Sequence, residues 1–249
     1  MGLRRDALLV GAGAGIALAA HVAPALASID PVRRVFAPRL AGLGDPGHVA
    51  LTFDDGPDPA STPEMLRVLD RLGWRATFFM LGDMVRRAPG LAGEVAAAGH
   101  EVAVHADRHV SMLRRAPRGA FDDIERARDA LVDATSVEPR WFRPPYGTLS
   151  AGALRGARRL GLETVLWTSW GRDWRPDATP ESVVHDVLRG HVPGGTVLLH
   201  DSDCTSSPGS WHATAGALPL LADELAGLAL RVGTIGDHGL VPARRSRAA

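Results

Sequence analysis

The sequence predicts an α/β fold of parallel βα units with about seven strands. Two observations lead to this prediction: short apolar runs alternate with longer stretches of helical period, and turn or cap signals separate them. Seven such runs come close to the strand number of a (β/α) barrel. A chain of 249 residues, 45% of them hydrophobic, can bury one core of this size. We therefore expect one main domain.

The expected strands are short, rich in apolar and β-branched residues, and bounded by polar or turn residues. They cover Val49–Phe53, Ala76–Met80, Glu101–His105, Arg140–Arg143, Thr164–Thr168, Thr196–His200 and Arg231–Ile235. Because helical segments separate consecutive strands, we expect the strands to run parallel.

The helices between these strands have readable starts and periods. Residues 62–64 and 179–181 both read Thr-Pro-Glu, which offers an N-cap, a proline at the first helical position and an early acid. Residues 120–134 carry apolar side chains at helical spacing. Residues 213–230 predict a further helix, with Pro219 near its start or at a kink.

Charge and cysteine content narrow the possible partners. Lys plus Arg equals Asp plus Glu, at 28 each, so no net field recruits nucleic acid, and a neutral substrate fits better. Cys204 is the only cysteine, which excludes an intramolecular disulfide. We expect it to be a small buried residue rather than a nucleophile.

The N-terminal residues 1–27 are typical of an export signal or a membrane anchor. Two arginines precede the apolar run ALLVGAGAGIALAA, and ALA-S at 25–28 resembles a signal-peptidase site. A twin-arginine signal and an N-terminal helix packed on the fold are the alternatives. With a signal or anchor, the protein is exported to the cell envelope or beyond it. Residues 28–47 read as a linker, 48–240 as the main domain and 241–249 as a tail.

Polar side chains gather where the expected strands end. Asp54 and Asp55 follow the first strand, and His105, Arg143 and His200 close three others. Asp-Gly-Pro by itself is ordinary turn chemistry. In parallel α/β folds, however, chemistry collects at the carboxyl ends of the strands. We therefore expect these side chains to form one site.

Asp55, His105 and His109 form the expected metal site. If one helical turn follows the third strand, the two histidines lie on one side and can share a metal. Two histidines and a carboxylate leave a position open, which is the pattern of a catalytic zinc. Iron or manganese could use the same ligands.

The neighbouring residues then have acid–base roles. Gly56 allows a sharp turn, so that both aspartates lean towards one site. Asp54 could take a proton from water, with Arg143 keeping it ionised, and His200 could protonate the leaving group. A buried, hydrogen-bonded histidine is the alternative reading of His200.

Five short motifs together resemble those of a known family. TFDDGP, HADRH, RPPYG, RDW and LLHD are similar, in this order, to the motifs of the polysaccharide deacetylase (NodB-homology) family, carbohydrate esterase family four. The resemblance covers about residues 48 to 237. It implies a distorted (β/α) barrel with seven strands, and a catalytic domain over 48–240.

The resemblance also implies roles for individual residues. Asp54 would be the base, His200 the acid and Arg143 the residue that orients the base, with Asp173 as the partner of Arg143. The metal, most readily zinc (Zn) with cobalt as an alternative, would bind Asp55, His105 and His109. The Tyr146 backbone amide would help to form the oxyanion hole, and the substrate-binding residues would be Pro144, Tyr146, Leu198 and Trp174.

Two positions depart from the family pattern. Ala106 stands where a Ser or Thr hydroxyl usually steadies the metal loop. Trp170 stands where the fourth motif usually carries an additional acid, which alters the groove. Tryptophans 167, 170, 174 and 211 could stack on sugar rings, with core packing as the alternative.

The expected function is metal-dependent removal of acetyl groups from N-acetylated sugars of a chitin-like or peptidoglycan glycan. O-deacetylation of acetylated xylan or a similar glycan is the enzymatic alternative, because the same site can perform it. A cell-surface carbohydrate-binding pseudoenzyme is the alternative from another class, but no catalytic residue is missing. The sequence leaves the oligomeric state open.

Overall fold

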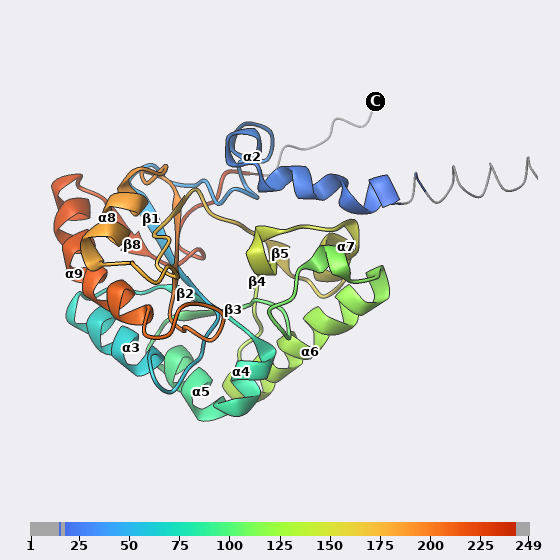
Figure 1. The fold of residues 1–249 in the computed structure, drawn as a ribbon, viewed down its shortest axis with the longest axis horizontal. Helices are drawn as coiled ribbons and strands as arrows, with labels where there is room; N and C mark the ends of the chain where they lie inside the picture. Colours follow the sequence, from blue (N-terminus) through green and yellow to red (C-terminus); the bar gives the residue numbers. More distant parts are fainter. Residues whose placement is uncertain (1–14, 16–17, 243–249) are drawn as a thin grey trace, which may run out of the picture.

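The computed structural model describes residue 15 and residues 18–242. Eight parallel strands in this part of the chain form one curled sheet, with helices around its outside (Figure 1). The strands are β1 (His48–Asp54), β2 (Thr77–Met80), β3 (Glu101–Val104), β4 (Trp141–Phe142), β5 (Glu163–Thr164), β6 (Ser169–Trp170), β7 (Thr196–His200) and β8 (Arg231–Gly233). The expected parallel α/β fold is confirmed.

The strand order is β5-β4-β3-β2-β1-β7-β6, and β8 also pairs with β1. The expected fifth strand, Thr164–Thr168, is wrong, because the chain there crosses from one edge of the sheet to the other. Leu166 N donates to Leu40 O, and Thr168 N donates to Thr196 O. The segment therefore splits into β5, which pairs with β4, and β6, which pairs with β7.

The helices confirm most of the expected helix positions. They are α2 (Asp30–Phe36), α3 (Thr62–Arg71), α4 (Gly82–Arg87), α5 (Pro89–Ala97), α6 (Pro117–Thr135), α7 (Ala151–Arg159), α8 (Pro180–Leu188) and α9 (Trp211–Gly227). Thr179 caps α8 as expected, accepting a hydrogen bond from Ser182 N. Thr62 is not an N-cap, because Ser61 precedes it there. Pro219 lies in the middle of α9, not near its start.

Alternation along the strands separates the core from the inner face of the curled sheet. Val49, Leu51 and Phe53 of β1 pack outward into the main core beneath the helices. Thr52 and Asp54, which alternate with them along the strand, point to the other face. The same alternation in β7 packs Val197 and Leu199 outward, so that its remaining side chains face inward. The inner face therefore carries Thr52 and Asp54 beside a second, smaller apolar cluster that includes Ala50, Phe79 and Ala103.

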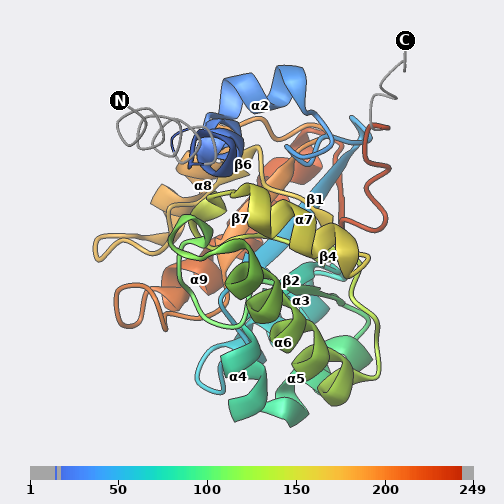
Figure 2. The ribbon, with the colours of Figure 1, turned by 90° about the vertical axis from the view of Figure 1, so that its right-hand side faces the viewer.

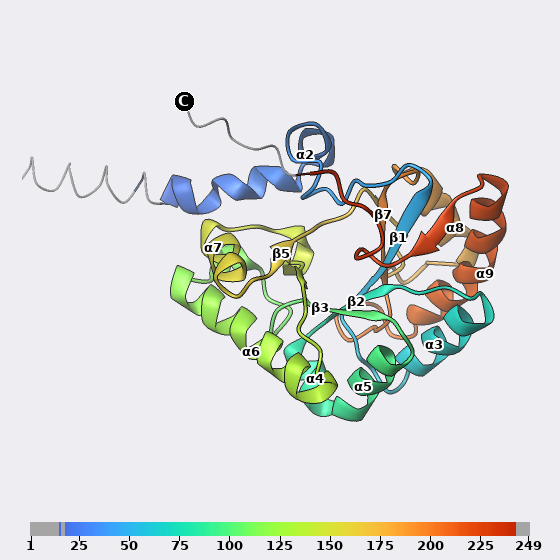
Figure 3. The same ribbon diagram turned by 180° about the vertical axis from the view of Figure 1, so that it is seen from behind.

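The segment expected as a linker, residues 28–47, packs onto the fold instead. It contains α2, which lies on the side of the sheet away from α3, α4 and α5 (Figures 2 and 3). Arg33 of α2 is 4% exposed and donates to the Trp167 carbonyl at 2.6 Å. A buried charged side chain needs such partners, so α2 is anchored to the sheet.

Before α2, residues 18–22 are helical and η1 (Ala23–Ser28) is a 3-10 helix. Among the described residues, no helix has the length and apolar character needed to cross a membrane. Most of the expected signal or anchor, and the end of the expected tail, lie outside the described residues.

Candidate metal and catalytic site

A cavity of about 230 Å³ opens at the carboxyl ends of the central strands. Its walls come from β1, β7 and the loops that follow β3, β4 and β6. The lining residues are Asp54, Asp55, His105, His109, Tyr146, Trp167, Trp170, Trp174, Leu198, His200, Thr205 and Ser206. The structure therefore brings together most of the residues that the sequence placed in the site.

The two adjacent aspartates reach the same histidine. His105 Nε2 lies 3.7 Å from Asp54 Oδ2 and 3.4 Å from Asp55 Oδ1. Strand alternation would send their side chains apart, but Asp55 has φ +82°, in the left-handed region, which turns the chain. Gly56 was expected to allow a sharp turn, but the structure shows that it makes room for the Asp201 carboxylate. A Cβ there would lie 2.1 Å from Asp201 Oδ2, so only glycine fits against that carboxylate.

Asp55, His105 and His109 converge as metal ligands would. Asp55 Oδ1 lies 3.4 Å from His105 Nε2 and 3.5 Å from His109 Nε2. Ligand atoms about 2.1 Å from a tetrahedral ion are about 3.4 Å apart, so the spacing fits. Asp55 Oδ1 is buried and has no hydrogen-bond partner. A buried carboxylate oxygen without a partner is costly unless an ion occupies the position beside it.

The charges and hydrogen bonds around these ligands favour the metal-binding state. His105 Nδ1 lies 2.9 Å from the Arg143 carbonyl, so it donates there and leaves Nε2 free to bind. Burial by itself would raise the pKa of Asp55, but the neighbouring histidines outweigh it and hold that pKa below its usual range. Burial lowers the pKa of His109 to about 4. Near neutral pH, the carboxylate is ionised and His109 is neutral.

The loop that carries the two histidines differs from the expected helical turn. Residues 105–109 are irregular, and Ala106 has φ +80°. The loop is fixed by other elements: Asp107 N donates to Asp123 of α6 at 3.1 Å, and Gly82 N donates to the Ala106 carbonyl at 3.0 Å. These contacts hold the backbone although Ala106 has no hydroxyl.

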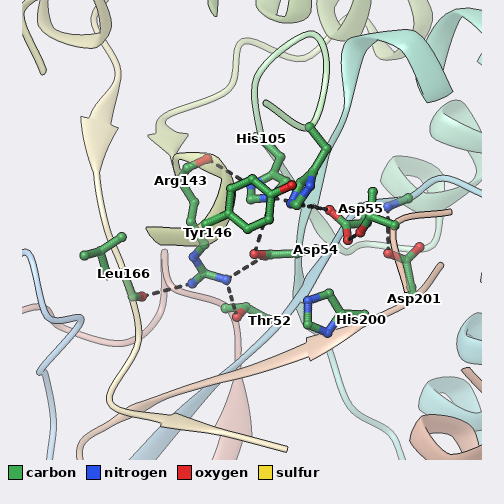
Figure 4. A network of polar contacts seen from close by, with 12 residues as sticks. Thr52, Asp54, Asp55, His105, Arg143, Tyr146, Leu166, His200 and Asp201 are labelled. Atoms are coloured by element: carbon green, nitrogen blue, oxygen red, sulfur yellow. Dashed lines mark hydrogen bonds and ion pairs between the residues drawn. The ribbon is translucent and has the colours of Figure 1, made fainter. Parts of the chain in front are cut away.

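Arg143 holds Asp54 in place, as expected (Figure 4). Its guanidinium is fully buried and donates to Asp54 Oδ1 at 2.7 Å, to Thr52 Oγ1 at 2.8 Å and to the Leu166 carbonyl at 3.0 Å. Burial lowers the pKa of Arg143, and the Asp54 carboxylate opposes that change. One oxygen of Asp54 is therefore fixed, and the other faces the metal-ligand cluster.

Asp173 is not the partner of Arg143, and this expectation is wrong. Its carboxylate accepts hydrogen bonds from His200 Nδ1 at 2.8 Å, from His200 N at 2.7 Å and from Thr214 Oγ1 at 2.7 Å. The loop after β6 lies beside the end of β7, which brings Asp173 to the histidine. Burial would lower the pKa of His200, but Asp173, together with Asp55 and Asp54, outweighs it and raises that pKa to about 10. His200 is therefore a protonated side chain at the cavity wall.

The remaining expected site residues divide into two groups. Tyr146 has φ +60° and packs its ring on His109 at 4.3 Å between centroids, and Leu198 and Trp174 line the cavity. Pro144 is buried and does not line the cavity. Trp211 is also absent from the cavity wall and stacks on its neighbour in α9 instead.

Cys204 is exposed, so its expected burial is wrong. The chain after β7 forms a surface loop there rather than a packed element. Its sulfur nevertheless lies against the protein, 3.6 Å from the Asp55 carbonyl oxygen, and desolvation there, beside the carboxylates of Asp55 and Asp201, raises the pKa of Cys204 to about 11. The thiol therefore stays protonated, and the expectation that it is no nucleophile fits this environment.

Sequence reasoning missed two residues that support the site. Asp201, 1% exposed, accepts hydrogen bonds from Gly56 N at 3.1 Å and Thr62 Oγ1 at 2.6 Å, and burial raises its pKa to about 7. Thr205 Oγ1 donates to Asp55 Oδ2 at 2.5 Å. The polar run HDSDCTSS after the sixth expected strand was the signal that could have identified both.

One cavity contains all of the proposed functional groups. They are a carboxylate and two histidines suited to a metal, a second carboxylate held by arginine, and a protonated histidine. Fold and site together are those of a hydrolase of the parallel α/β class with side chains that could hold a metal ion.

Comparison with known proteins identifies the family. Residues 42–165 match the model of the family described as polysaccharide deacetylase. The chain is 36% identical to a peptidoglycan-N-acetylglucosamine deacetylase of Bacillus cereus, over 76% of this chain and 86% of that protein. It is 37% identical to a chitooligosaccharide deacetylase of Bradyrhizobium, over 70% of this chain and 84% of that protein. The solved structure of a family 4 carbohydrate esterase from Streptomyces lividans in complex with acetate is similar to this chain, with a TM-score of 0.69 and 32% identity. The match covers 78% of this chain and 97% of that one.

This chain belongs to the polysaccharide deacetylase family, carbohydrate esterase family four. The resemblance carried by the five sequence motifs is thereby confirmed, and so is the distorted (β/α) barrel expected from it.

Proposed function

We propose that this protein removes acetyl groups from N-acetylated sugars of a chitin-like or peptidoglycan glycan, in a metal-dependent hydrolysis. The observation that supports this most strongly is the position of Asp54. Its Oδ2 lies 3.7 Å from Nε2 of His105, one of the three proposed metal ligands, while Arg143 fixes Oδ1 at 2.7 Å. The names of the relatives from Bacillus cereus and Bradyrhizobium support N-acetylated sugars as the substrate class.

A divalent ion, zinc or cobalt, bound by Asp55, His105 and His109 would act as a Lewis acid towards the acetyl carbonyl. Asp54 takes a proton from the attacking water, and the Tyr146 backbone amide donates a hydrogen bond to the developing oxyanion.

His200 and the apolar wall complete the proposed reaction. His200, held protonated by Asp173, gives its proton to the nitrogen of the leaving sugar. This step matters because an amine leaves poorly without a proton. Leu198 borders the acetyl methyl group, and Trp174 offers an aromatic wall beside the sugar.

Ester cleavage on acetylated xylan is the alternative activity, because the same groups can attack an O-acetyl ester. A binding-only pseudoenzyme is less well supported, since the base, the acid and the three ligand side chains are all in place.

The test is incubation of zinc-loaded protein with chitooligosaccharides, peptidoglycan fragments and acetylated xylan, with both acetate and new amine measured. We expect acetate and amine in equal amounts from the N-acetylated glycans. Acetate released only from xylan, without amine, would favour the esterase. No acetate from any of the three substrates would contradict both enzymatic functions.

We also propose that the protein works at the cell envelope or outside it, because glycans of this class lie there. Membrane attachment through the N-terminus is one way to hold it there. Fractionation of the native host, followed by immunoblotting, should find the protein with the envelope or the medium. An intact chain confined to the cytosol would contradict this location.

A further inference from the structure

A second cavity, of about 370 Å³, adjoins the catalytic one. The two cavities share Tyr146, Trp167 and Trp170 as lining residues. The side chains of Asp30 and Arg33, on α2, form part of the wall of the second cavity. The mechanism proposed above uses neither this space nor α2.

Three tryptophans form a row between the catalytic histidine and this second cavity. Ring centroids lie 5.7 Å apart for Trp174 and His200, 4.8 Å for Trp170 and Trp174, and 6.1 Å for Trp167 and Trp170. All three indoles are half-buried. All three line the catalytic cavity, and large aromatic rings are suited to the apolar faces of sugars. A glycan with one sugar in the catalytic cavity can therefore extend along this row into the second cavity.

The negative charges in the wall of the second cavity are already paired. Asp30 Oδ1 lies 3.1 Å from Arg33, and its Oδ2 lies 2.9 Å from Arg34. Asp186 Oδ2 lies 2.9 Å from Arg175. Neither carboxylate is therefore left to attract a cation into the cavity.

Two positive charges in the same wall have no such partner. Within residues 18–242, Arg172 and Arg189 form no ion pair with a carboxylate, and both are exposed. The Arg172 guanidinium lies over the Trp170 ring, 5.2 Å from its centroid, which places the cation beside the aromatic row. The cavity therefore offers two free guanidinium groups, and guanidinium recognises carboxylates well.

Trp170 also favours an anionic ligand in this cavity. Trp170 lines both cavities and carries no charge. It adds no negative charge beside Arg172, and the two carboxylates in the wall, Asp30 and Asp186, are each paired with arginine.

We propose that the second cavity binds a sugar unit that bears a carboxylate and that adjoins the N-acetylated sugar to be deacetylated. Arg172 and Arg189 recognise the carboxylate, and the tryptophan row holds the rings between the two cavities. This inference rests on the proposed function and narrows its substrate class. It assigns the enzyme to glycans with an acidic unit next to each acetamido sugar, in preference to neutral polymers.

The experiment uses two forms of one glycan and the zinc-loaded enzyme. The probe is an oligosaccharide of alternating N-acetylglucosamine and N-acetylmuramic acid, whose lactyl groups carry carboxylates. The comparison substrate is the same oligosaccharide with every carboxylate converted to a methylamide. The measured quantity is the ratio of kcat/KM for the two forms, from acetate release. An exposed ion pair changes binding by up to about fivefold, so two arginines should give a ratio of up to about 25-fold.

We expect the Arg172→Gln and Arg189→Gln double variant to bring this ratio near one, and added salt to lower it in the wild type. Arg118→Gln is the control. It removes one positive charge from an exposed site on α6, where Arg118 pairs with Asp122, and should keep the wild-type ratio.

Equal rates of the wild type on both forms would overturn this inference while leaving deacetylation intact. A wild-type ratio that persists in the double variant would also overturn it. No acetate from either form, or from chitooligosaccharides, would instead contradict the proposed function, and this inference with it.

Discussion

Asp54 and His200 are register partners on two neighbouring parallel strands, β1 and β7. Both end their strands, and both side chains point to the inner face of the sheet, where they line one cavity. The separation of the proposed base from the proposed acid is therefore set by strand pairing rather than by flexible loops. Groups mounted on a sheet in this way keep their geometry while substrates enter and leave.

The metal site should be lost on removal of one ligand. We expect His105→Ala to weaken zinc binding by more than about 100-fold, because it deletes one of three converging ligand atoms. Isothermal titration calorimetry and metal analysis after dialysis measure this. His185→Ala, on the exposed face of α8, is the matched control and should bind zinc like the wild type. Unchanged zinc affinity in His105→Ala would show that the metal lies elsewhere.

Asp173 should set the pH range over which His200 can act. Burial lowers the pKa of His200, but Asp173, helped by Asp55 and Asp54, raises it to about 10, so His200 is protonated below that pH and loses its proton above it. In Asp173→Asn the pKa should fall towards the ordinary value of about 6.5. We expect the alkaline limb of the profile of kcat against pH to move to lower pH by at least about one pH unit. A limb that stays in place would contradict the role of the pair.

The same pair gives a stability prediction with a defined sign. A histidine whose pKa is raised by folding contributes its full stability below the unfolded value of about 6.5, and loses it as pH rises towards the folded value. The difference in unfolding free energy between wild type and Asp173→Asn should therefore shrink between pH 7 and pH 10. Urea denaturation of the metal-free proteins measures it, and a difference that grows with pH would contradict the assignment.

Asp123 should control metal affinity from outside the ligand set. It is fully buried, accepts the Asp107 amide at 3.1 Å and pairs with Arg115 at 2.7 Å, which fixes the loop between the two histidines. We expect Asp123→Ala to lower zinc affinity by about 10-fold or more, as loss of a supporting contact does at other metal sites. Asp122→Ala, its half-exposed neighbour on α6, is the control. Equal affinities in the two variants would contradict this role.

The site was largely predictable because parallel strands bring their carboxyl ends to one edge. Asp54, Asp55, His105 and His200 could be placed together from strand ends alone, and five motifs placed the family. The arrangement of loops was not predictable in the same way. Asp173 follows β6 in an irregular segment, so no register could indicate that it pairs with His200 rather than Arg143.

Two further errors have a common physical origin. The fifth expected strand was misplaced because residues 165–168 have the apolar pattern of a strand but pair with Leu40 and Thr196 across the opening of the sheet. The linker was misread because Arg33 looks like a surface charge in the sequence, yet it is buried against Trp167. Tertiary hydrogen bonds decide both cases, and local patterns do not contain them.

The most direct test of the account is turnover of Asp54→Asn at measured metal content. Asparagine keeps the size of the side chain and an oxygen for Arg143, but it cannot take a proton from water. We predict that this variant binds zinc like the wild type and that its kcat on an N-acetylated oligosaccharide falls by about 100-fold or more. Asp70→Asn, at an exposed position on α3, should retain wild-type kcat. Near-normal turnover of Asp54→Asn with zinc bound would contradict the assignment of Asp54 as the base.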